Sequence, residues 1–561
     1  MTQIRLLPLM NNFSLLPHRL IPNSIKVFLL AFALVTASLL LQGNIGINLA
    51  DEGFLWYGTV QTVLGEVPIR DFQSYDPARY YWGAFWLKIF GNNGLISLRI
   101  STAIFQFLGL SFGLLSLRRV MKSWWMLTVA GLILLLWMYP NFYIFEPSMA
   151  MAAVYFAVLL LESPSLLQHF ISGVFVGLSA FMGLNHGLYT FLSFLLLLVF
   201  VWVLDKNVFL KSFVTWGFGI LIGYSTILLM LAVIPGFFEC YVESIKFYFR
   251  TGETNLPLPV PFPWRVDYSN LSFIQALSAF FKGLFFLILP LFNCIIIIYL
   301  LFCRPSFRRK NLLIAATFVS LTYMHHAFSR ADLEHLSASI HPFLIGLISL
   351  APAFNLKLRK FNRLNSDALD PVLPPTRYQT QPGNEFQPNL GLVFALAATL
   401  FSVGTAHPFY LKATAAPGQY VQQNIINDSI SMDVEIAKLI DKVSQINRQI
   451  PQNDLLLIAP HWTTLYPILQ RKSPLWDIYF LFPETEERQR KMILELRNKN
   501  VNWVIIGDVL LDGRDDLRFK NTHPLVWEHL MQDFEAIPPK LPYNHQLMHR
   551  KSTSPQRSHT Q

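Results

Sequence analysis

The sequence predicts a polytopic α-helical membrane protein that carries a small α/β domain at its C-terminal end. Two observations support this fold class. Hydrophobic residues make up 53% of the 561 residues and charged residues only 14%, with a mean hydropathy of +0.40, values far from those of soluble proteins. Apolar stretches close to the length that crosses a bilayer recur up to residue 405, and the sequence beyond it is polar.

About eleven of these stretches are predicted transmembrane helices, some of them short. The first, from Val27 to Leu41, resembles a signal peptide, but no convincing small-residue cleavage site follows it. We therefore interpret it as an uncleaved anchor. The predicted spans begin near Val27, Leu95, Trp124, Ser148, Phe170, Leu188, Ser212, Phe273, Asn311, Ser337 and Asn389.

Basic residues gather in the loops at one end of the predicted spans, and most acidic residues in the loops at the other end. Because Lys and Arg near span ends stay on the cytoplasmic side, this pattern predicts a multi-pass protein of the cell (inner) membrane with a cytoplasmic N-terminus. The net charge of +10 comes from short clusters between spans, so we predict the lipid bilayer as a partner and no nucleic acid. The basic clusters are Arg118 to Lys122, Lys206 to Lys211, Arg304 to Lys310 and Lys357 to Arg363. The outer acids include Asp51, Glu52, Glu66, Asp71, Asp76, Glu146, Asp332 and Glu334.

The chain divides into two predicted domains. Residues 1–405 form the transmembrane domain, with a first outer loop over 44–94 and a cytoplasmic linker over 353–388. Residues 406–561, here named the C-terminal module, form a soluble α/β domain on the extracytoplasmic side.

Local patterns add detail to both domains. In the C-terminal module, short β-rich runs at 454–459 and 501–507 predict buried strands, and the charged run 484–498 predicts a solvated helix. Three cysteines cannot form a disulfide framework. Five glycines lie inside apolar spans, where small residues permit close helix packing, and these are Gly173, Gly177, Gly217, Gly219 and Gly223.

The first outer loop contains the candidate catalytic residues. Asp51 and Glu52 open a stretch with one apolar face, which predicts a helix lying in the membrane interface. Asp51 is either a catalytic base or the N-cap of this helix. We favour the base, because a cap alone does not call for an adjacent glutamate. Glu52 is expected to orient Asp51 or to help hold a divalent ion.

Three segments of this loop resemble the GT-C superfamily of membrane glycosyltransferases, in particular its protein-mannosyltransferase-like and aminoarabinose-transferase-like bacterial branch. The segments are Asp51 to Gly53, Gly65 to Phe72 and Tyr80 to Trp82, and the arrangement of many spans followed by an outer module is similar too. The resemblance implies a sugar donor on polyprenyl phosphate and an active site facing away from the cytosol. It also implies an essential acidic residue in the first outer loop, a role that falls by position on Asp51.

At one motif the chain departs from these relatives. Many of them show Lys or His with paired prolines after the aspartate-containing turn, where this chain has Asp76, Pro77, Ala78 and Arg79. Relatives often carry a second acid in the second outer loop, and Glu146 resembles it by position. Glu146 is equally well read as a boundary marker before the next helix.

Sugar transfer to a hydroxyl requires a base on the acceptor and charge stabilisation on the departing phosphate. Arg330 and Arg79 are the candidate phosphate ligands, since guanidinium groups match phosphate oxygens. Asp332 and His335 share a helix face by their spacing, so they could position the acceptor or coordinate a metal. Asp76 and His326 are further candidates for the same tasks. A divalent metal ion is the one candidate cofactor, although histidines at a membrane interface more often make ordinary hydrogen bonds.

Together these features predict an inverting glycosyltransferase that moves a sugar from a polyprenyl-phosphate donor to a hydroxyl of a glycan, lipid or protein. The main alternative is a transporter or flippase of lipid-linked saccharides, because charged residues in membranes also mark substrate paths. Transporters show internal repeats and interrupted helices at the midplane. Here the polar residues gather at the outer surface, which favours the enzyme. A receptor or scaffold would need far fewer spans.

Overall fold

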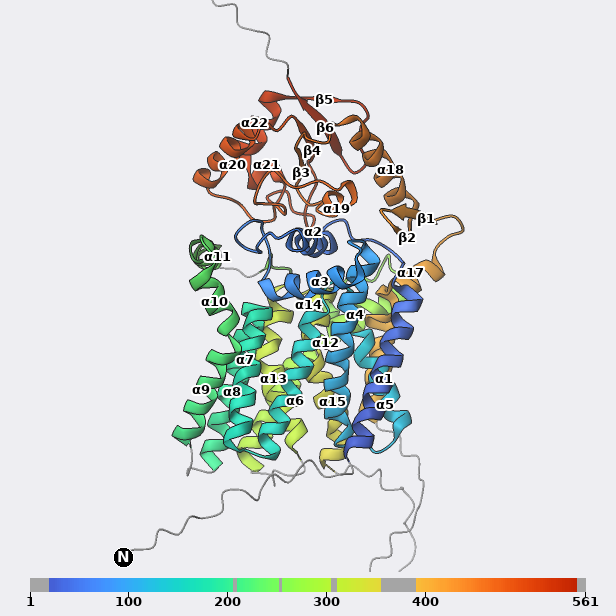
Figure 1. Cartoon of the computed structure of the whole chain (residues 1–561). Coiled ribbons are helices and arrows are strands. Elements are labelled where there is room, and N and C mark those ends of the chain that lie inside the picture. Colours follow the sequence, from blue (N-terminus) through green and yellow to red (C-terminus); the bar gives the residue numbers. More distant parts are fainter. Residues whose placement is uncertain (1–19, 205–208, 252–254, 304–309, 355–389, 552–561) are drawn as a thin grey trace, which may run out of the picture.

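The computed structural model describes residues 20–204, 209–251, 255–303, 310–354 and 390–551. A bundle of long helices forms one end of the molecule, and the C-terminal module lies over the other end (Figure 1). The predicted cytoplasmic linker lies outside the described residues from residue 355 onward. The bundle and its outer loop contain α1 (Leu20–Gln42), α2 (Asp51–Val63), α3 (Pro77–Phe90), α4 (Leu95–Arg118), α5 (Trp124–Leu136), α6 (Phe145–Glu162), α7 (Leu166–Met182), α8 (Leu184–Leu204), α9 (Phe209–Gly223), α10 (Ser225–Val233), α11 (Phe237–Thr251), α12 (Phe273–Cys303), α13 (Asn311–Ser329), α14 (Leu333–Ser339), α15 (His341–Phe354) and α16 (Leu390–Ser402).

Every predicted span coincides with a helix or a pair of helices. Within the described residues, six helices are long and apolar enough to cross a membrane, or up to nine if each of three bent pairs is one span. The bent pairs are α9 with α10, α14 with α15, and α16 with its continuation. The two remaining predicted spans are α5 and α7, which are shorter, and 13 residues of α5 rise only about 20 Å. The chain is a multi-pass membrane protein, and helix length and composition mark six to nine candidate spans within the described residues, where the sequence predicts about eleven.

Small residues bring α7 and α9 together. A Cβ atom on Gly173 would collide with the backbone oxygen of Trp216, and one on Gly223 with the backbone oxygen of Val174. Gly177 and Gly219 are equally close to the facing helix, whereas Gly217 faces open space. The predicted role in helix packing is therefore confirmed for four of the five glycines.

The first outer loop forms α2 and α3, which lie across the bundle beneath the C-terminal module (Figure 1). The sequence predicted that α2 has one apolar face and lies in the membrane interface. The single buried face is wrong, and the place in the interface stays a prediction. Phe54, Leu55, Trp56 and Tyr57 are successive residues and all are at most 3% exposed. The bundle covers one side of α2. The C-terminal module covers the other side, which the sequence pattern predicted to face water.

The C-terminal module contains the strands that the sequence predicted. Its four-stranded sheet has the order β3-β4-β6-β5, in which β3 and β4 are parallel and the other pairs antiparallel. Its boundary near residue 405 stays a prediction. The elements are α17 (Pro408–Thr414), β1 (Tyr420–Ile425), β2 (Asp428–Asp433), α18 (Val434–Gln449), β3 (Leu456–Ala459), α19 (Leu465–Leu469), α20 (Glu486–Asn498), β4 (Trp503–Gly507), α21 (Phe519–Thr522), α22 (Pro524–Asp533), β5 (Phe534–Ile537) and β6 (His545–Arg550).

The module and the first outer loop share one hydrophobic core, in which residues of α2 pack with residues of α18, β3 and α19. Backbone hydrogen bonds cross the junction, from Thr464 N to Leu49 O at 3.0 Å and from Gln73 N to Trp476 O at 2.8 Å. A Cβ atom on Gly53 would collide with Thr464. The outer loop is therefore held from above by the module and from below by the bundle.

Candidate functional site

A polar cavity lies at the end of the bundle that faces the module. It holds about 620 Å³ of empty space, part of it open to the outside. We name it the outer cavity. Its lining comes from α3, α6, α8, α13, α14 and the loops between them, and consists of Tyr75, Asp76, Arg79, Tyr143, Glu146, Gly183, Asn185, His186, Asn255, His326, Glu334 and His335.

A buried ion pair between Arg79 and Glu146 forms one wall of the outer cavity. Arg79 Nη1 donates to Glu146 Oε1 at 2.9 Å, and the two side chains are only 6% and 7% exposed. The guanidinium also lies 5.1 Å from the Tyr75 ring centre, a distance typical of cation–π contacts. Burial tends to lower the pKa of Arg79, but the nearby charges of Glu146 and Asp76 outweigh burial and raise it. The wall of the cavity therefore holds a buried cation that stays charged.

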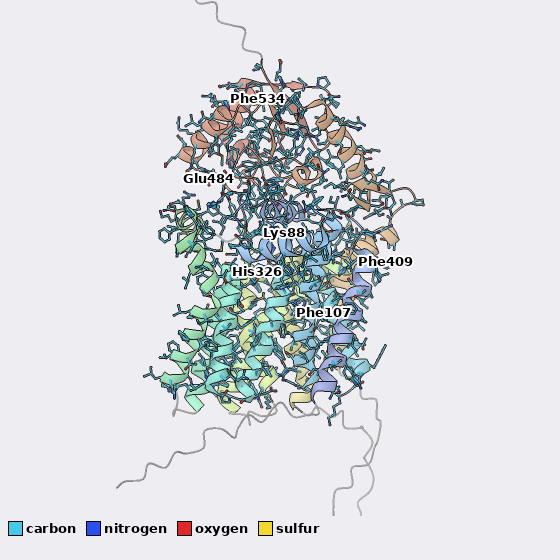
Figure 2. All side chains as sticks on the ribbon, viewed as in Figure 1. Lys88, Phe107, His326, Phe409, Glu484 and Phe534 are labelled. Carbon is cyan, nitrogen blue, oxygen red and sulfur yellow. The ribbon has the colours of Figure 1, made fainter. Side chains whose placement is uncertain are left out.

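Several buried polar atoms around the outer cavity have no hydrogen-bond partner among the described residues. They are Arg79 Nε, Glu146 Oε2, His186 Nδ1 and His326 Nδ1. His186 and His326 face each other with ring centres 6.0 Å apart, and Figure 2 shows His326 near the end of the bundle that faces the module. Because an unpartnered buried polar group costs about 1–3 kcal/mol, four such atoms around one cavity indicate a place for a polar ligand or for water.

Asp51 lies at the first position of α2, beside the outer cavity. Tyr479 of the C-terminal module donates its hydroxyl to Asp51 Oδ1 at 2.9 Å. Burial raises the pKa of Asp51, against the opposing effects of this hydrogen bond and of the positive charges of His335 and Arg330. Tyr75 lines the cavity, and its pKa lies well above the ordinary value. Burial is the main cause, and the negative charge of Asp51 is the second. Asp51 is therefore electrostatically linked to the cavity.

The alternative role of Asp51 as an N-cap is wrong. The N-cap position of α2 is Ala50. The side chain of Asn48 accepts hydrogen bonds from the backbone N–H groups of Ala50 and Asp51, both at 2.8 Å. Asn48 thus does the work that the sequence pattern assigned to aspartate, and it leaves the Asp51 carboxylate free to face Tyr479.

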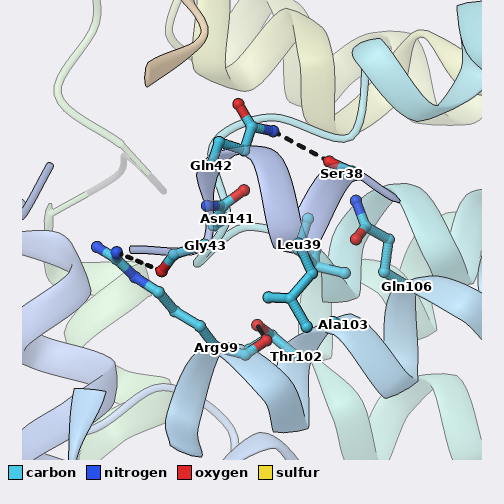
Figure 3. A pocket seen from close by; sticks show the side chains of 10 residues that line it. Ser38, Leu39, Gln42, Gly43, Arg99, Thr102, Ala103, Gln106 and Asn141 are labelled. Carbon is cyan, nitrogen blue, oxygen red and sulfur yellow. Dashed lines mark hydrogen bonds between the residues drawn. The ribbon is translucent and has the colours of Figure 1, made fainter. Parts of the chain in front are cut away.

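The sequence predicted that Glu52 orients Asp51 or helps to hold a divalent ion. In the structure Glu52 pairs with Arg99 instead. Its two carboxylate oxygens accept from Arg99 Nε and Nη2 at 2.7 and 2.8 Å, and both side chains are buried. Arg99 also donates to the backbone oxygen of Gly43 at 2.9 Å, beside a smaller cavity between α1 and α4 (Figure 3). Because successive helical residues point in different directions, Asp51 faces the module while Glu52 anchors the chain to α4.

The cluster after α13 is held by the protein itself. Arg330 donates to both Asp512 oxygens at 2.6 and 2.7 Å and to Asp332 Oδ2 at 2.7 Å. Asp332 Oδ1 accepts from the backbone N–H of His335, which caps α14, and lies 2.8 Å from His335 Nδ1. Burial tends to raise the pKa of Asp332, but the hydrogen bonds from His335 and Arg330 lower it. The side chains of Asp332 and His335 meet, but Asp332 is the N-cap of α14 and not a residue on a face of that helix.

The predicted metal ligands lie in one region but do not form an ion site. Both oxygens of Asp332 are engaged by Arg330 and His335. Within the described ranges, no group of three His, Cys, Asp or Glu side chains has an arrangement that could hold a metal ion. Asp76 lines the outer cavity, and burial raises its pKa against the opposing charge of Arg79. These side chains do not fit a metal centre.

The structure gathers most of the predicted site residues in one region. Asp76, Arg79, Glu146, His326 and His335 line the outer cavity. Asp51 acts electrostatically on Tyr75 and Glu334 of the lining, Asp332 contacts His335, and Arg330 contacts Asp332. Glu52 is elsewhere and pairs with Arg99.

The prediction missed part of the lining, namely Asn185, His186 and Asn255, and gave Glu334 no role in the site. His186 carried a usable signal, because a titratable residue in the apolar helix α8 is costly without a function.

Comparison with known proteins gave matches among solved structures. No protein-family model matches the sequence, and no curated protein matches it. ArnT from Cupriavidus metallidurans, bound to undecaprenyl phosphate, is 13% identical, with a TM-score of 0.48 over 96% of this chain and 99% of that one. The Archaeoglobus fulgidus oligosaccharyltransferase tethered to an acceptor peptide is 12% identical, with a TM-score of 0.45 over 93% of this chain and 74% of that one.

Both identities are 13% or lower and both TM-scores are 0.48 or lower. The likeness is distant, and the chemistry of this chain has to come from its own residues.

Proposed function

We propose that this protein is an inverting glycosyltransferase that transfers a sugar from a polyprenyl-phosphate donor to an acceptor hydroxyl on the extracytoplasmic side of the cell (inner) membrane. One observation carries the proposal. The outer cavity combines a buried Arg79–Glu146 pair with four unpartnered polar atoms, at the end of a membrane-spanning bundle and next to Asp51. Such a cavity suits a substrate whose polar part is charged and whose remainder lies in lipid.

Asp51 is the proposed base. A carboxylate works best as a general base when its pKa lies close to the working pH, and burial raises the pKa of Asp51 in that direction. The acceptor oxygen forms a bond to the anomeric carbon while the bond from that carbon to the phosphate oxygen breaks. The acceptor proton moves to Asp51, and the polyprenyl phosphate leaves with the bonding electrons. One displacement of this kind inverts the anomeric carbon.

Arg79 is the proposed ligand of the donor phosphate, because it is the cation in the cavity lining and its Nε has no partner among the described residues. Glu146 holds its charge in place. Arg330 is the second candidate, and its guanidinium would have to exchange Asp512 for phosphate. Fixed cations of this kind stabilise the negative charge that develops on the leaving group.

The proposed orientation places the outer cavity and the C-terminal module outside the cell membrane and the N-terminus in the cytosol. Residue Ile96, near the start of α4, donates to Asp428 of the module, and Arg118 and Arg119 lie at the opposite end of this helix. Basic residues favour the cytoplasmic side. The donor lipid then reaches the cavity from the bilayer.

The test is a transfer assay with purified protein in lipid nanodiscs, radiolabelled polyprenyl phosphosugars and bacterial envelope acceptors. We expect the wild type to transfer label and Asp51→Asn to lose activity by about 100-fold or more, the contribution of a general base. Asp267→Asn is the matched control, because Asp267 is an exposed outer acid that does not line the cavity. Full activity of Asp51→Asn would refute the base, and donor binding without any transfer would favour the transporter.

A further inference from the structure

The loop between α19 and α20 of the C-terminal module reaches Asp51. Tyr479 in this loop is 9% exposed. Its hydroxyl donates to Asp51 Oδ1, and among the described residues the other oxygen of Asp51 has no hydrogen-bond partner. One oxygen of the proposed base is thus held by the module, and the other is available to a substrate.

The first outer loop holds Tyr479 in this position through a single side chain. Gln73 Oε1 accepts from the backbone N–H groups of Ile478 and Tyr479, both at 2.9 Å. Gln73 Nε2 donates to the backbone oxygen of Tyr479 at 3.2 Å. Three hydrogen bonds to one glutamine fix the backbone on both sides of the tyrosine ring.

Aromatic neighbours fix the ring itself. The Tyr479 ring centre lies 5.6 Å from that of Phe54, which is three residues after Asp51 in α2. On another side, His461 follows strand β3 and meets the tyrosine edge to face at 5.7 Å. A ring held between α2 and the sheet of the module has little freedom to turn its hydroxyl away from Asp51.

Such a hydrogen bond has two effects on a carboxylate. It favours the charged form and so lowers the pKa, opposing the burial that raises the pKa of Asp51. It also fixes the direction of the free oxygen, which a proton transfer to that oxygen requires. A base that is too strongly desolvated would stay protonated, and a base that rotates would miss the acceptor.

Given the proposed function, we propose that Tyr479 is a positioning residue for Asp51 and that the C-terminal module is an integral part of the transfer site. The module sets the direction and the ionisation of the base through one hydroxyl. It does so from a segment that is 428 residues distant in the sequence.

The first test compares Tyr479→Phe with the wild type in the pH dependence of kcat/KM. Loss of the hydroxyl removes an effect that lowers the pKa of Asp51, so the acid limb of the profile moves to higher pH. We expect kcat to fall roughly tenfold, as for the loss of about 1.4 kcal/mol, with the KM for the donor unchanged. Tyr543→Phe is the control, because Tyr543 is an exposed tyrosine of the same module. An acid limb and kcat equal to those of the wild type would overturn the proposal.

The second test does not depend on transfer. Thermal unfolding of Asp51→Ala, Tyr479→Phe and the double variant forms a mutant cycle, which measures the coupling between the two side chains. We expect the double variant to differ from the sum of the single effects. Additive effects would overturn the positioning role even in an active enzyme. If no donor supports transfer, the proposed function fails, while the cycle still decides whether Tyr479 and Asp51 are coupled.

Discussion

Arg330 and Asp512 form a bidentate ion pair that joins the loop after α13 to the C-terminal module, with distances of 2.6 and 2.7 Å. The two residues are 182 positions apart. Asp512 has a φ of 55°, in the left-handed region that Asn and Asp adopt more readily than other residues except Gly. A short turn of the module is therefore shaped so that a carboxylate meets a guanidinium next to the outer cavity.

Asp512→Asn is expected to loosen this turn without changing its backbone, since Asn tolerates the same φ. The charged pair becomes a neutral hydrogen bond, a loss of roughly 1.5 kcal/mol. Amide hydrogen exchange over residues 508–516 should become about tenfold faster. Asp516→Asn in the same turn is the control, because the Asp516 side chain is 63% exposed. Equal exchange in both variants would show that the pair does not hold the turn.

Asp51→Asn should be more stable than the wild type at neutral pH while it loses activity. Burial raises the pKa of Asp51, so its charged form disfavours folding once the pH exceeds that pKa. The gain in the midpoint of thermal unfolding should shrink as the pH falls through the pKa and vanish below the ordinary value of 3.8.

Asp71→Asn provides a control of opposite sign. Burial tends to raise the pKa of Asp71, but hydrogen bonds from Arg70 and from the Val67 backbone lower it. Its charged form therefore favours folding above the ordinary pKa, and this contribution is lost as the pH falls through the lowered pKa. Asp71→Asn should be less stable than the wild type at neutral pH. If both variants changed the stability at neutral pH in the same direction, the opposite pKa shifts of Asp51 and Asp71 would be contradicted.

Glu146→Gln should destabilise the protein and weaken donor binding. It removes the charged partner that accepts a hydrogen bond from buried Arg79, and breaking such a buried pair costs about 3–5 kcal/mol. Thermal unfolding and the KM for the donor measure the two effects. Glu162→Gln is the control, because the Arg119–Glu162 pair is 22% and 40% exposed, and exposed pairs contribute no more than about 1 kcal/mol. Similar losses in both variants would mean that the burial of Arg79 does not matter.

Glu52→Gln separates stability from chemistry. The variant leaves Arg99 buried without a matching charge, so we expect a fall in thermal stability of similar size to that of Glu146→Gln. The protein that remains folded should keep the wild-type kcat and the wild-type pH profile, because Glu52 faces Arg99 and not Asp51. A kcat reduced like that of Asp51→Asn would restore Glu52 to the catalytic machinery.

The two carboxylates that open α2 show where sequence reasoning stops. Both were assigned to catalysis, since adjacent acids at a helix start are unusual. Their directions differ by about 100° around the helix axis, and this sends one to the C-terminal module and the other to α4. The role of each carboxylate depends on the residue that it faces. Asp51 faces Tyr479, 428 residues away, and Glu52 faces Arg99, 47 residues away.

The same limit explains the cluster after α13. Its spacing indicated that Asp332 and His335 lie close together, and they do, with Asp332 as the N-cap of α14 instead of a residue on its face. The partner of Arg330 could not be foreseen, because Asp512 belongs to another domain. His186 was overlooked because it lies beside Asn185 at the start of α8, before the apolar run that predicts the span from Leu188.

The amino-acid sequence by itself determined the membrane class, the helical segments, the strands of the module and the acidic character of one end of the bundle. Each of these follows from composition and from periodicity within some 20 residues, the range over which hydrophobic patterning acts. The tertiary structure alone decided which charges are paired and which face the outer cavity. Pairing depends on side chains that folding brings together from distant parts of the chain. Burial then sets the strength of the electrostatic interaction between them.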